Sequence, residues 1–194
     1  MAKTVNYIDK KRYLSKLIKT HPLEFPHILK TVLETLRYRY LQKCVGKNSI
    51  VGEGTKIINF ANVSIGNHCL IQDHVYIRAG FDGKVKIGDY CAINSFAKLF
   101  GHGGIEIGEY TQLGPDCLIT TTKHDYQEEL KTSFEKVEIG RWAWVGAKCV
   151  ILPGTKIGDH SIIGAGSIVT KDIPQWSVAV GNPARVIKTY GEKN

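Results

Sequence analysis

The stretch IGRWAW-VGAKCV-ILPGTK-IGDHSI-IGAGSI-VTKDIP, residues 139–174, divides into six blocks of six residues. Twelve further blocks of the same kind occupy residues 45–62, 65–82, 87–104 and 107–124, so the blocks come in sets of three. The first residue of all eighteen blocks is Ile, Val or Leu, the second is Gly in ten, and the fifth is mostly small. A fixed hexapeptide period is typical of a parallel β-helix.

Three blocks would form one triangular coil, with the aliphatic first residue inside and the small fifth residue at the bend. The sequence therefore predicts a mainly β protein with about six stacked coils over residues 45–188. Gly at the second position is expected to supply corner backbone angles. Extra residues follow complete sets of three and are expected to form loops on one edge, at 63–64, 83–86, 105–106 and, as a long excursion, 125–138. The period alone does not fix the handedness, although most parallel crossovers are right-handed.

Residues 1–44 differ in kind from the repeat. They hold ten Lys and Arg against three acids, so they carry +7 of the chain's net charge of +8. We predict two amphipathic helices that cap the open first coil; a surface for an anionic membrane, a lipid-linked substrate or a neighbouring subunit is the alternative. No aromatic platforms interleave the basic residues, so nucleic acid is not an expected partner. Apolar residues recur at helical spacing at Tyr13, Leu14, Leu17, Ile18, Ile28, Val32, Leu33, Leu36 and Tyr40.

The remaining composition is ordinary for a globular protein, at 43% hydrophobic and 23% charged residues. No run of eighteen apolar residues and no signal-like N-terminus is present, so we expect a cytoplasmic protein without a membrane span. A cap over 175–188 and a short tail at 189–194 are expected to follow the coils. An odd cysteine count without CxxC argues against a disulfide framework or a zinc cluster. We predict buried thiols, selected for size, at the fifth-position residues Cys69, Cys91, Cys117 and Cys149.

The repeat breaks in the block ITTTKH, where Lys123 occupies a fifth position. A lysine does not fit inside so narrow a prism, so the chain is expected to leave the wall there. The next residue is His124, and fourteen residues, DYQEELKTSFEKVE, separate it from the next block. A histidine at the root of a polar loop on a rigid wall is a candidate general base. The alternative is a loop histidine with no catalytic role.

From about Ile57 to Lys188 the chain resembles the hexapeptide-repeat acetyltransferases, which have a left-handed parallel β-helix. Within them it is most similar to the galactoside and maltose O-acetyltransferases and to the sugar acetyltransferases of polysaccharide synthesis. The motifs that carry the resemblance are TTKHD at 121–125, WVGAKCVILPGTKIG at 144–158, IGAGSIVTKDIP at 163–174 and VGNPARVIK at 180–188. The resemblance implies a homotrimer that uses acetyl-CoA, acts on a sugar or glycan precursor and needs no metal.

The resemblance also implies roles for individual residues. His124 would abstract the proton of the acceptor hydroxyl, and Asn94 would help to hold the acceptor and the thioester. His102 aligns with an acidic position of the family's acceptor site, and a second acidic residue of the family has no counterpart here, so the acceptor stays open. The positions that match the family's acetyl-CoA site are Trp144, Ala147, Ala165, Thr170, Lys171, Arg185 and Lys188.

Several alternatives remain open. The sequence does not separate O-acetylation from N-acetylation of an amino sugar. A γ-class carbonic anhydrase would need a zinc-binding histidine set, but His68 and His74 are six residues apart and the expected motif is missing. A non-catalytic solenoid would have no reason to break the repeat at His124. Trp142 and Trp144, two residues apart, are expected to point outward and to mark an interface between subunits.

Overall fold

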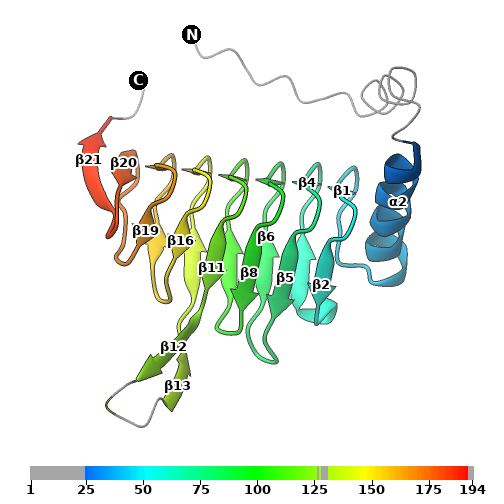
Figure 1. Ribbon diagram of the computed structural model, residues 1–194, viewed down its shortest axis with the longest axis horizontal. Coiled ribbons are helices and arrows are strands. Elements are labelled where there is room, and N and C mark those ends of the chain that lie inside the picture. The colour runs from blue at the N-terminus through cyan, green and yellow to red at the C-terminus, as the bar shows by residue number, and fades with distance from the viewer. Residues whose placement is uncertain (1–24, 126, 128–130, 192–194) are drawn as a thin grey trace.

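The computed structural model describes residues 25–125, 127 and 131–191. It is mainly β, with a helical segment followed by a solenoid of about six turns, as the repeat predicts (Figure 1). The helical segment consists of the α-helix α2, Phe25–Leu36, continued by the π-helix η2, Arg37–Leu41. The first amphipathic run, around Leu14, lies outside the described residues, so the helix predicted there stays a prediction.

Three sheets form the faces of the solenoid, and in each turn the chain passes from the eight-stranded to the six-stranded to the five-stranded sheet. The eight-stranded sheet contains, in order, β1 (Ile50–Val51), β4 (Leu70–Ile71), β7 (Ala92–Ile93), β10 (Gln112–Leu113), β15 (Trp144–Val145), β18 (Ile162–Ile163), β20 (Ser177–Val180) and β21 (Arg185–Thr189). All its neighbours are parallel except β21, which runs antiparallel to β20. This last pair forms the C-terminal cap, which reaches Thr189, one residue beyond the predicted end.

The six-stranded sheet contains β2 (Lys56–Ile58), β5 (Tyr76–Ala79), β8 (Lys98–Gly101), β11 (Leu118–Thr120), β16 (Val150–Ile151) and β19 (Ile168–Val169). The five-stranded sheet contains β3 (Val63–Ile65), β6 (Val85–Ile87), β9 (Ile105–Ile107), β14 (Val137–Ile139) and β17 (Lys156–Ile157). Between β11 and β14 the chain forms an antiparallel hairpin of β12 (Thr122–Asp125) and β13 (Lys131–Phe134). A short 3-10 helix, η3 (Phe60–Asn62), follows β2.

The interior of the prism holds the first residue of every block, as predicted. All eighteen of these residues are at most 6% exposed and belong to one continuous core cluster. The four fifth-position cysteines are at most 1% exposed. Their thiols donate to backbone carbonyls of the neighbouring coil, as Cys117 does to the Gly146 oxygen at 3.0 Å. The prediction of buried thiols selected for size is confirmed.

The second-position glycines serve a different purpose from the one predicted. None of the ten has a positive φ; the left-handed corners fall instead on the fourth residue of a block, as at His68 and Trp142, both with φ 57°. A Cβ on Gly146 would lie 2.6 Å from the backbone nitrogen of Ala165 in the next coil. Glycine is therefore needed at this position because adjacent coils approach too closely for a side chain.

The three edges of the prism carry different residues. The glycine edge, between the eight- and six-stranded sheets, contains Gly52, Gln72, Asn94, Gly114, Gly146 and Gly164 with the residue after each. The insertion edge, between the six- and five-stranded sheets, contains residues 59–62, 80–84, 101–104, 121–136, 152–155 and 170–172. The aromatic edge, between the five- and eight-stranded sheets, contains His68, Tyr90, Tyr110, Trp142, His160 and Trp176.

All insertions lie on the insertion edge, which confirms the prediction of loops on one edge (Figure 1). Their bounds differ from those predicted, because residues 63–64 and 105–106 belong to strands of the five-stranded sheet. The long excursion begins at Thr122, before the predicted 125. The repeat resumes at Val137, since that side chain is fully buried and pairs with Ile105.

The helix α2 covers the first coil through a narrow set of contacts. Ile28 is buried, and the Thr35 hydroxyl accepts the Val51 N–H at 2.9 Å. Tyr38 is also buried, which raises the pKa of its phenol, and its hydroxyl donates to the Thr55 carbonyl at 3.0 Å. Other members of the predicted apolar face remain exposed, namely Val32, Leu33, Leu36 and Tyr40. None of the helices in the described part of the chain has the length and apolar character that a membrane crossing requires.

Candidate active site

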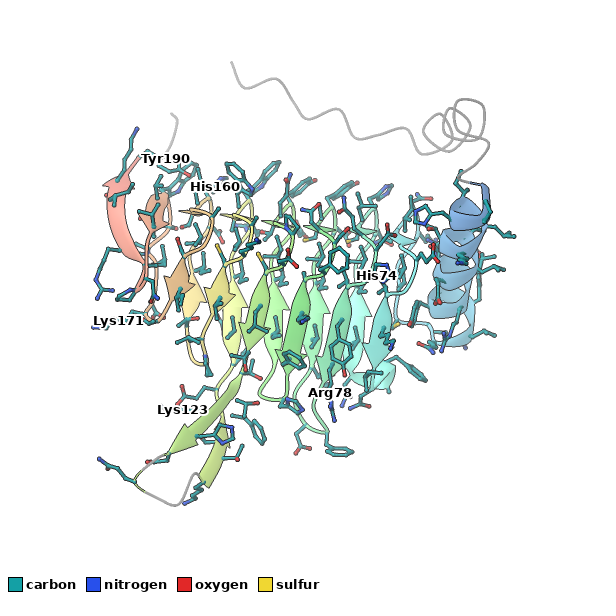
Figure 2. The ribbon with its side chains drawn as sticks, in the orientation of Figure 1. His74, Arg78, Lys123, His160, Lys171 and Tyr190 are labelled. Carbon is teal, nitrogen blue, oxygen red and sulfur yellow. The ribbon has the colours of Figure 1, made fainter. Side chains whose placement is uncertain are left out.

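The β12–β13 hairpin, which contains His124, extends away from the solenoid wall (Figure 1), and Figure 2 shows Lys123 on it. Lys123 is exposed, and its Nζ pairs with a Glu135 carboxylate oxygen at 2.9 Å, which raises the pKa of the lysine. His124 is exposed and lies opposite Thr132, whose Oγ1 is 3.3 Å from His124 Nδ1. The prediction that the chain leaves the wall at Lys123 is confirmed. The histidine is held on a ladder of strand hydrogen bonds and not on an irregular loop.

His102 lies beside the hairpin on the insertion edge. Its ring stacks on Phe134, with centroids 5.8 Å apart and planes at 23°. Phe134 pairs with Thr122 in the hairpin, and His124 pairs with Thr132. Since alternate residues of a strand share a face, Phe134 and His124 lie on one face of the hairpin. Of the two histidines assigned to the acceptor side, His102 therefore stacks on Phe134, and His124 shares a face of the hairpin with it.

Asn94 lies on the glycine edge and is half-buried. Its Nδ2 donates to the Leu113 carbonyl at 2.6 Å, so the wall fixes the orientation of the amide. Ala147 and Ala165 lie on the same edge in the fifth and sixth coils, and the Gly166 N–H donates to the Ala147 carbonyl at 2.8 Å. The structure thus brings these three predicted residues onto one edge, with Asn94 nearest the N-terminal end.

Four predicted donor-site residues lie at the C-terminal end of the solenoid. Thr170 and Lys171 follow β19 on the insertion edge, whereas Arg185 and Lys188 lie on β21. Figure 2 shows Lys171 at this end. All four are exposed. Within the described part of the chain, Lys171 and Lys188 form no ion pair, and Arg185 donates only to the neighbouring Ala184 carbonyl at 3.0 Å.

Exposed cations and exposed small residues both occur at this end of the molecule. Three cations without acidic partners suit a ligand that carries several phosphate charges. Ala165 and Gly166 are exposed, and a Cβ added to Gly166 would meet no atom within 4 Å. This open strip of small residues leads from the cationic end toward Ala147 and would accommodate a thin pantetheine arm.

His102 packs against the hairpin that carries the candidate base, but one chain does not bring this base to the predicted residues of the glycine edge. His124 extends from the insertion edge, whereas Asn94 and Ala147 lie on the glycine edge, across the six-stranded sheet. The crossing from Gly146 to Leu152 takes six residues, or about 20 Å at ~3.3 Å per residue. His124 on one side, and Asn94 with Ala147 on the other, therefore form two half-sites on opposite borders of the six-stranded sheet.

The two tryptophans point outward, as predicted, but they do not share a strand. Trp144 begins β15 on the eight-stranded face and is 56% exposed. Trp142 lies in the left-handed turn before it, and its ring stacks between Tyr110 at 4.2 Å and His160 at 6.2 Å. That both mark an interface stays a prediction: Trp142 is 54% exposed, although its ring also stacks on rings of its own chain.

Backbone N–H groups near Gly146 and Ala147 are candidates for stabilising negative charge on a reacting carbonyl oxygen. The Gly146 N–H donates to the Ile163 carbonyl at 2.8 Å, so it is already used in a hydrogen bond between adjacent coils. Of the pair, this leaves Ala147 as the candidate.

The histidines considered as zinc ligands lie on different edges. His68 stacks on Tyr90 at the aromatic edge, and His74 stacks on Phe96 at the glycine edge. In the described parts of the chain, no three His, Cys, Asp or Glu side chains are grouped to hold a metal ion.

Two features of the surface were missed at the level of sequence. The aromatic edge was visible as His, Tyr, Tyr, Trp and His at the fourth position of every third block, once the blocks are aligned by coil. Phe81 was visible too, because it occupies a fifth position as Lys123 does, yet it is 97% exposed. Aligning the blocks by face would have revealed both.

Comparisons with known proteins agree with this architecture. The family model described as bacterial transferase hexapeptide (six repeats) matches residues 136–171. A galactoside O-acetyltransferase of Lactococcus lactis is 33% identical over 186 residues, which cover 92% of this chain and 89% of that protein. A galactoside O-acetyltransferase of Escherichia coli is 34% identical over 135 residues, covering 68% of this chain and 66% of that protein.

A solved structure is similar as well. It is a mutant of AntD, an N-acyltransferase from Bacillus cereus, in complex with dTDP-4-amino-4,6-dideoxyglucose and coenzyme A. The TM-score is 0.70 at 27% identity, and the match covers 76% of this chain and 83% of that chain. The similarity includes the repeat that forms the solenoid, which is consistent with a left-handed hexapeptide β-helix.

Proposed function

Because this chain belongs to the hexapeptide-repeat acetyltransferases that include the galactoside O-acetyltransferases, we propose that it acetylates a hydroxyl of a sugar or glycan precursor. It is an acyltransferase, and its donor is a coenzyme A thioester. The observation that carries the finer proposal is His124, mounted on a regular hairpin that leaves the wall where the repeat breaks.

In the proposed reaction, acetyl-CoA supplies an activated acetyl group. His124 takes the proton of the acceptor hydroxyl as the oxygen attacks the carbonyl carbon of the thioester, with Nε2 as the accepting nitrogen because Nδ1 faces Thr132. The C–S bond then breaks, the proton passes from His124 to the sulfur, and free coenzyme A leaves as the thiol beside the acetyl ester. Asn94 holds the reactants, and the Ala147 N–H faces the carbonyl oxygen. The five cysteines are all buried, so direct transfer between two bound reactants is favoured over a thiol-linked intermediate.

The two half-sites support a homotrimer with sites shared between subunits. The outer face of the five-stranded sheet pairs its own charges, with Lys136 at 2.7 Å from Glu106 and 3.0 Å from Glu138. Since these charges are already paired within one chain, we expect this face to contact solvent and not another subunit. Placing the glycine edge of one copy against the insertion edge of the next would unite Asn94 and Ala147 with His124, and a cyclic trimer closes this contact.

N-acetylation of an amino sugar is the second candidate. The structural similarity to an N-acyltransferase bound to an amino sugar nucleotide favours it. An amine that is neutral when bound needs less help from a base than a hydroxyl does, so dependence on His124 separates the two reactions.

The test is release of free thiol from acetyl-CoA across a panel of sugars, nucleotide-sugars and amino sugars. Turnover with a sugar that lacks an amino group, lost in a His124→Ala variant, is the expected result. Turnover only with amino sugars would replace O- by N-acetylation. No thiol release with any acceptor, by protein that binds acetyl-CoA, would overturn the sugar proposal.

A further inference from the structure

Phe81 is the most exposed large apolar side chain among the described residues of the insertion edge, at 97%. It occupies the fifth position of the block IRAGFD at 77–82, where a small inward residue is the rule. A phenylalanine left in water forgoes the stabilisation that burial of its ring would give. Its outward placement is a second departure from the repeat, on the same edge as Lys123.

The backbone of the Phe81 loop is held firmly. Asn62 Nδ2 donates to the Gly80 carbonyl at 3.0 Å and to the Phe81 carbonyl at 2.7 Å. On the other side, a Cβ added to Gly83 would collide with the His102 carbonyl oxygen, so the loop packs directly against the 101–104 loop. The ring is therefore presented to solvent on a fixed support, and little order is lost when a ligand binds it.

A continuous surface connects Phe81 with the candidate base. The Phe81 loop packs on His102, the His102 ring stacks on Phe134, and Phe134 shares a hairpin face with His124. Phe81 belongs to the second coil and the hairpin to the fourth. With coils ~4.8 Å apart, the two positions differ by about 10 Å along the axis.

The direction of this surface indicates what it would bind. Ala147, Ala165 and the unpaired cations lie in the fifth coil and beyond, so the donor would occupy the C-terminal side of His124. Phe81 lies on the opposite, N-terminal side. We propose that Phe81 binds a flat ring joined to the reacting sugar, so that the preferred acceptor is larger than a monosaccharide. This inference rests on the proposed role of His124.

The ring could be a second sugar or a nucleotide base, since both present a flat face to an aromatic side chain. Arg78 distinguishes these sources. It is exposed three residues before Phe81, and within the described residues it forms no ion pair or side-chain hydrogen bond (Figure 2). A nucleotide would bring phosphates to this guanidinium, whereas a neutral disaccharide would not.

The experiment compares galactose, lactose and UDP-galactose as acceptors for wild type, Phe81→Ala and Phe81→Trp, with thiol release as the readout. Phe81→Ala should raise KM for lactose or UDP-galactose about tenfold and leave kcat and the KM for galactose unchanged. Phe81→Trp should restore the lower KM. Tyr40→Ala, which removes a 65% exposed aromatic side chain from η2, is the matched control and should change nothing.

Calorimetric binding of the same three compounds makes the test independent of catalysis. Weaker binding of lactose or UDP-galactose to Phe81→Ala supports the inference even if none is acetylated, in which case only the acceptor chemistry proposed above fails. If Phe81→Ala weakens the binding of UDP-galactose alone, and Arg78→Gln weakens it too, the ring is a nucleotide base. If Phe81→Ala weakens the binding of lactose alone, the ring is a second sugar. The inference is overturned if Phe81→Ala changes the affinity for all three compounds equally or changes none of them. It is also overturned if wild type binds neither lactose nor UDP-galactose more tightly than galactose. A changed molecular mass of Phe81→Ala in light scattering also overturns it, because Phe81 would then contact a second copy.

Discussion

The aromatic edge and the insertion edge are built on the same coils but differ in how faithfully they repeat. Along the aromatic edge, six rings stack with neighbouring centroids 3.9–6.2 Å apart and planes within 8°. Tyr190 closes the stack edge-on against Trp176, and its hydroxyl donates to the His160 carbonyl. Along the insertion edge, each of the first four coils carries a different loop or hairpin.

The difference shows how a solenoid separates stability from chemistry. Each ring of the aromatic edge contacts the equivalent residue one coil away, so conserving the register from coil to coil adds contacts. The loops of the insertion edge do not stack on one another in this way, so they can differ from coil to coil. Three consecutive coils can therefore carry Phe81, His102 and His124 as projecting side chains. We therefore expect changes on the two edges to affect different measurements.

The largest effect is expected for His124→Ala on the insertion edge. Loss of a general base should lower kcat by about 10²–10⁴ and leave the affinity for acetyl-CoA nearly unchanged. Thiol release and calorimetric binding measure the two quantities. His160→Ala, a histidine of the aromatic edge, is the control and should retain kcat. Near-normal turnover of purified His124→Ala would remove this residue from the mechanism.

Mixed oligomers test whether the insertion edge of one chain forms an active site together with a neighbouring chain. We expect light scattering to show about three times 21.6 kDa. His124→Ala and Trp144→Ala proteins, each first shown to be impaired alone, are then co-expressed in equal amounts. If sites are shared, random mixing restores about one quarter of them. No recovery in the mixture, or a monomer with full activity, contradicts a shared site.

A smaller effect is expected at the C-terminal end, beyond the irregular loops. Lys171→Ala and Arg185→Ala should each weaken acetyl-CoA binding about tenfold, the usual consequence of losing a charge-assisted contact. Binding of 3′-dephospho-acetyl-CoA should change less. Lys47→Ala, an exposed lysine of the first coil, is the control. Wild-type affinities of both variants for both donors would show that these cations do not contact the nucleotide.

The smallest effect is expected on the aromatic edge itself. Trp142→Ala removes stacking on Tyr110 and His160 and should lower the free energy of unfolding by about 1–2 kcal/mol. The corresponding fall in Tm is about 2–8 °C for a chain of this size, with kcat at 25 °C unchanged. Trp142→Tyr should retain most of the stability. A change in oligomer mass on Trp142→Ala would instead place this residue at a subunit interface.

The sequence predicted the solenoid, its inward residues and the edge that carries the insertions. It succeeded because the interior imposes one rule, an apolar side chain every six residues, and Val51, Ile71 and Ile93 obey it without exception. It also predicted that the chain leaves the solenoid wall at Lys123, because a lysine side chain is too large for the interior. The role of the second-position glycines was predicted for the wrong reason, since the constraint is the distance to the next coil and not a dihedral angle.

By itself, then, the sequence determined which residues point inward, where the chain leaves the wall and which positions match an acetyl-CoA site. The first two are local properties, set by the period and by the size of single side chains, whereas the third rests on the resemblance of its motifs to those of a known family. Only the tertiary structure decided that Asn94 and His124 lie on opposite borders of one sheet, and that Trp142 stacks within its own chain. Those facts depend on how coils align along the axis, because residues that touch there are about twenty positions apart, as in the pairing of Ile93 with Leu113.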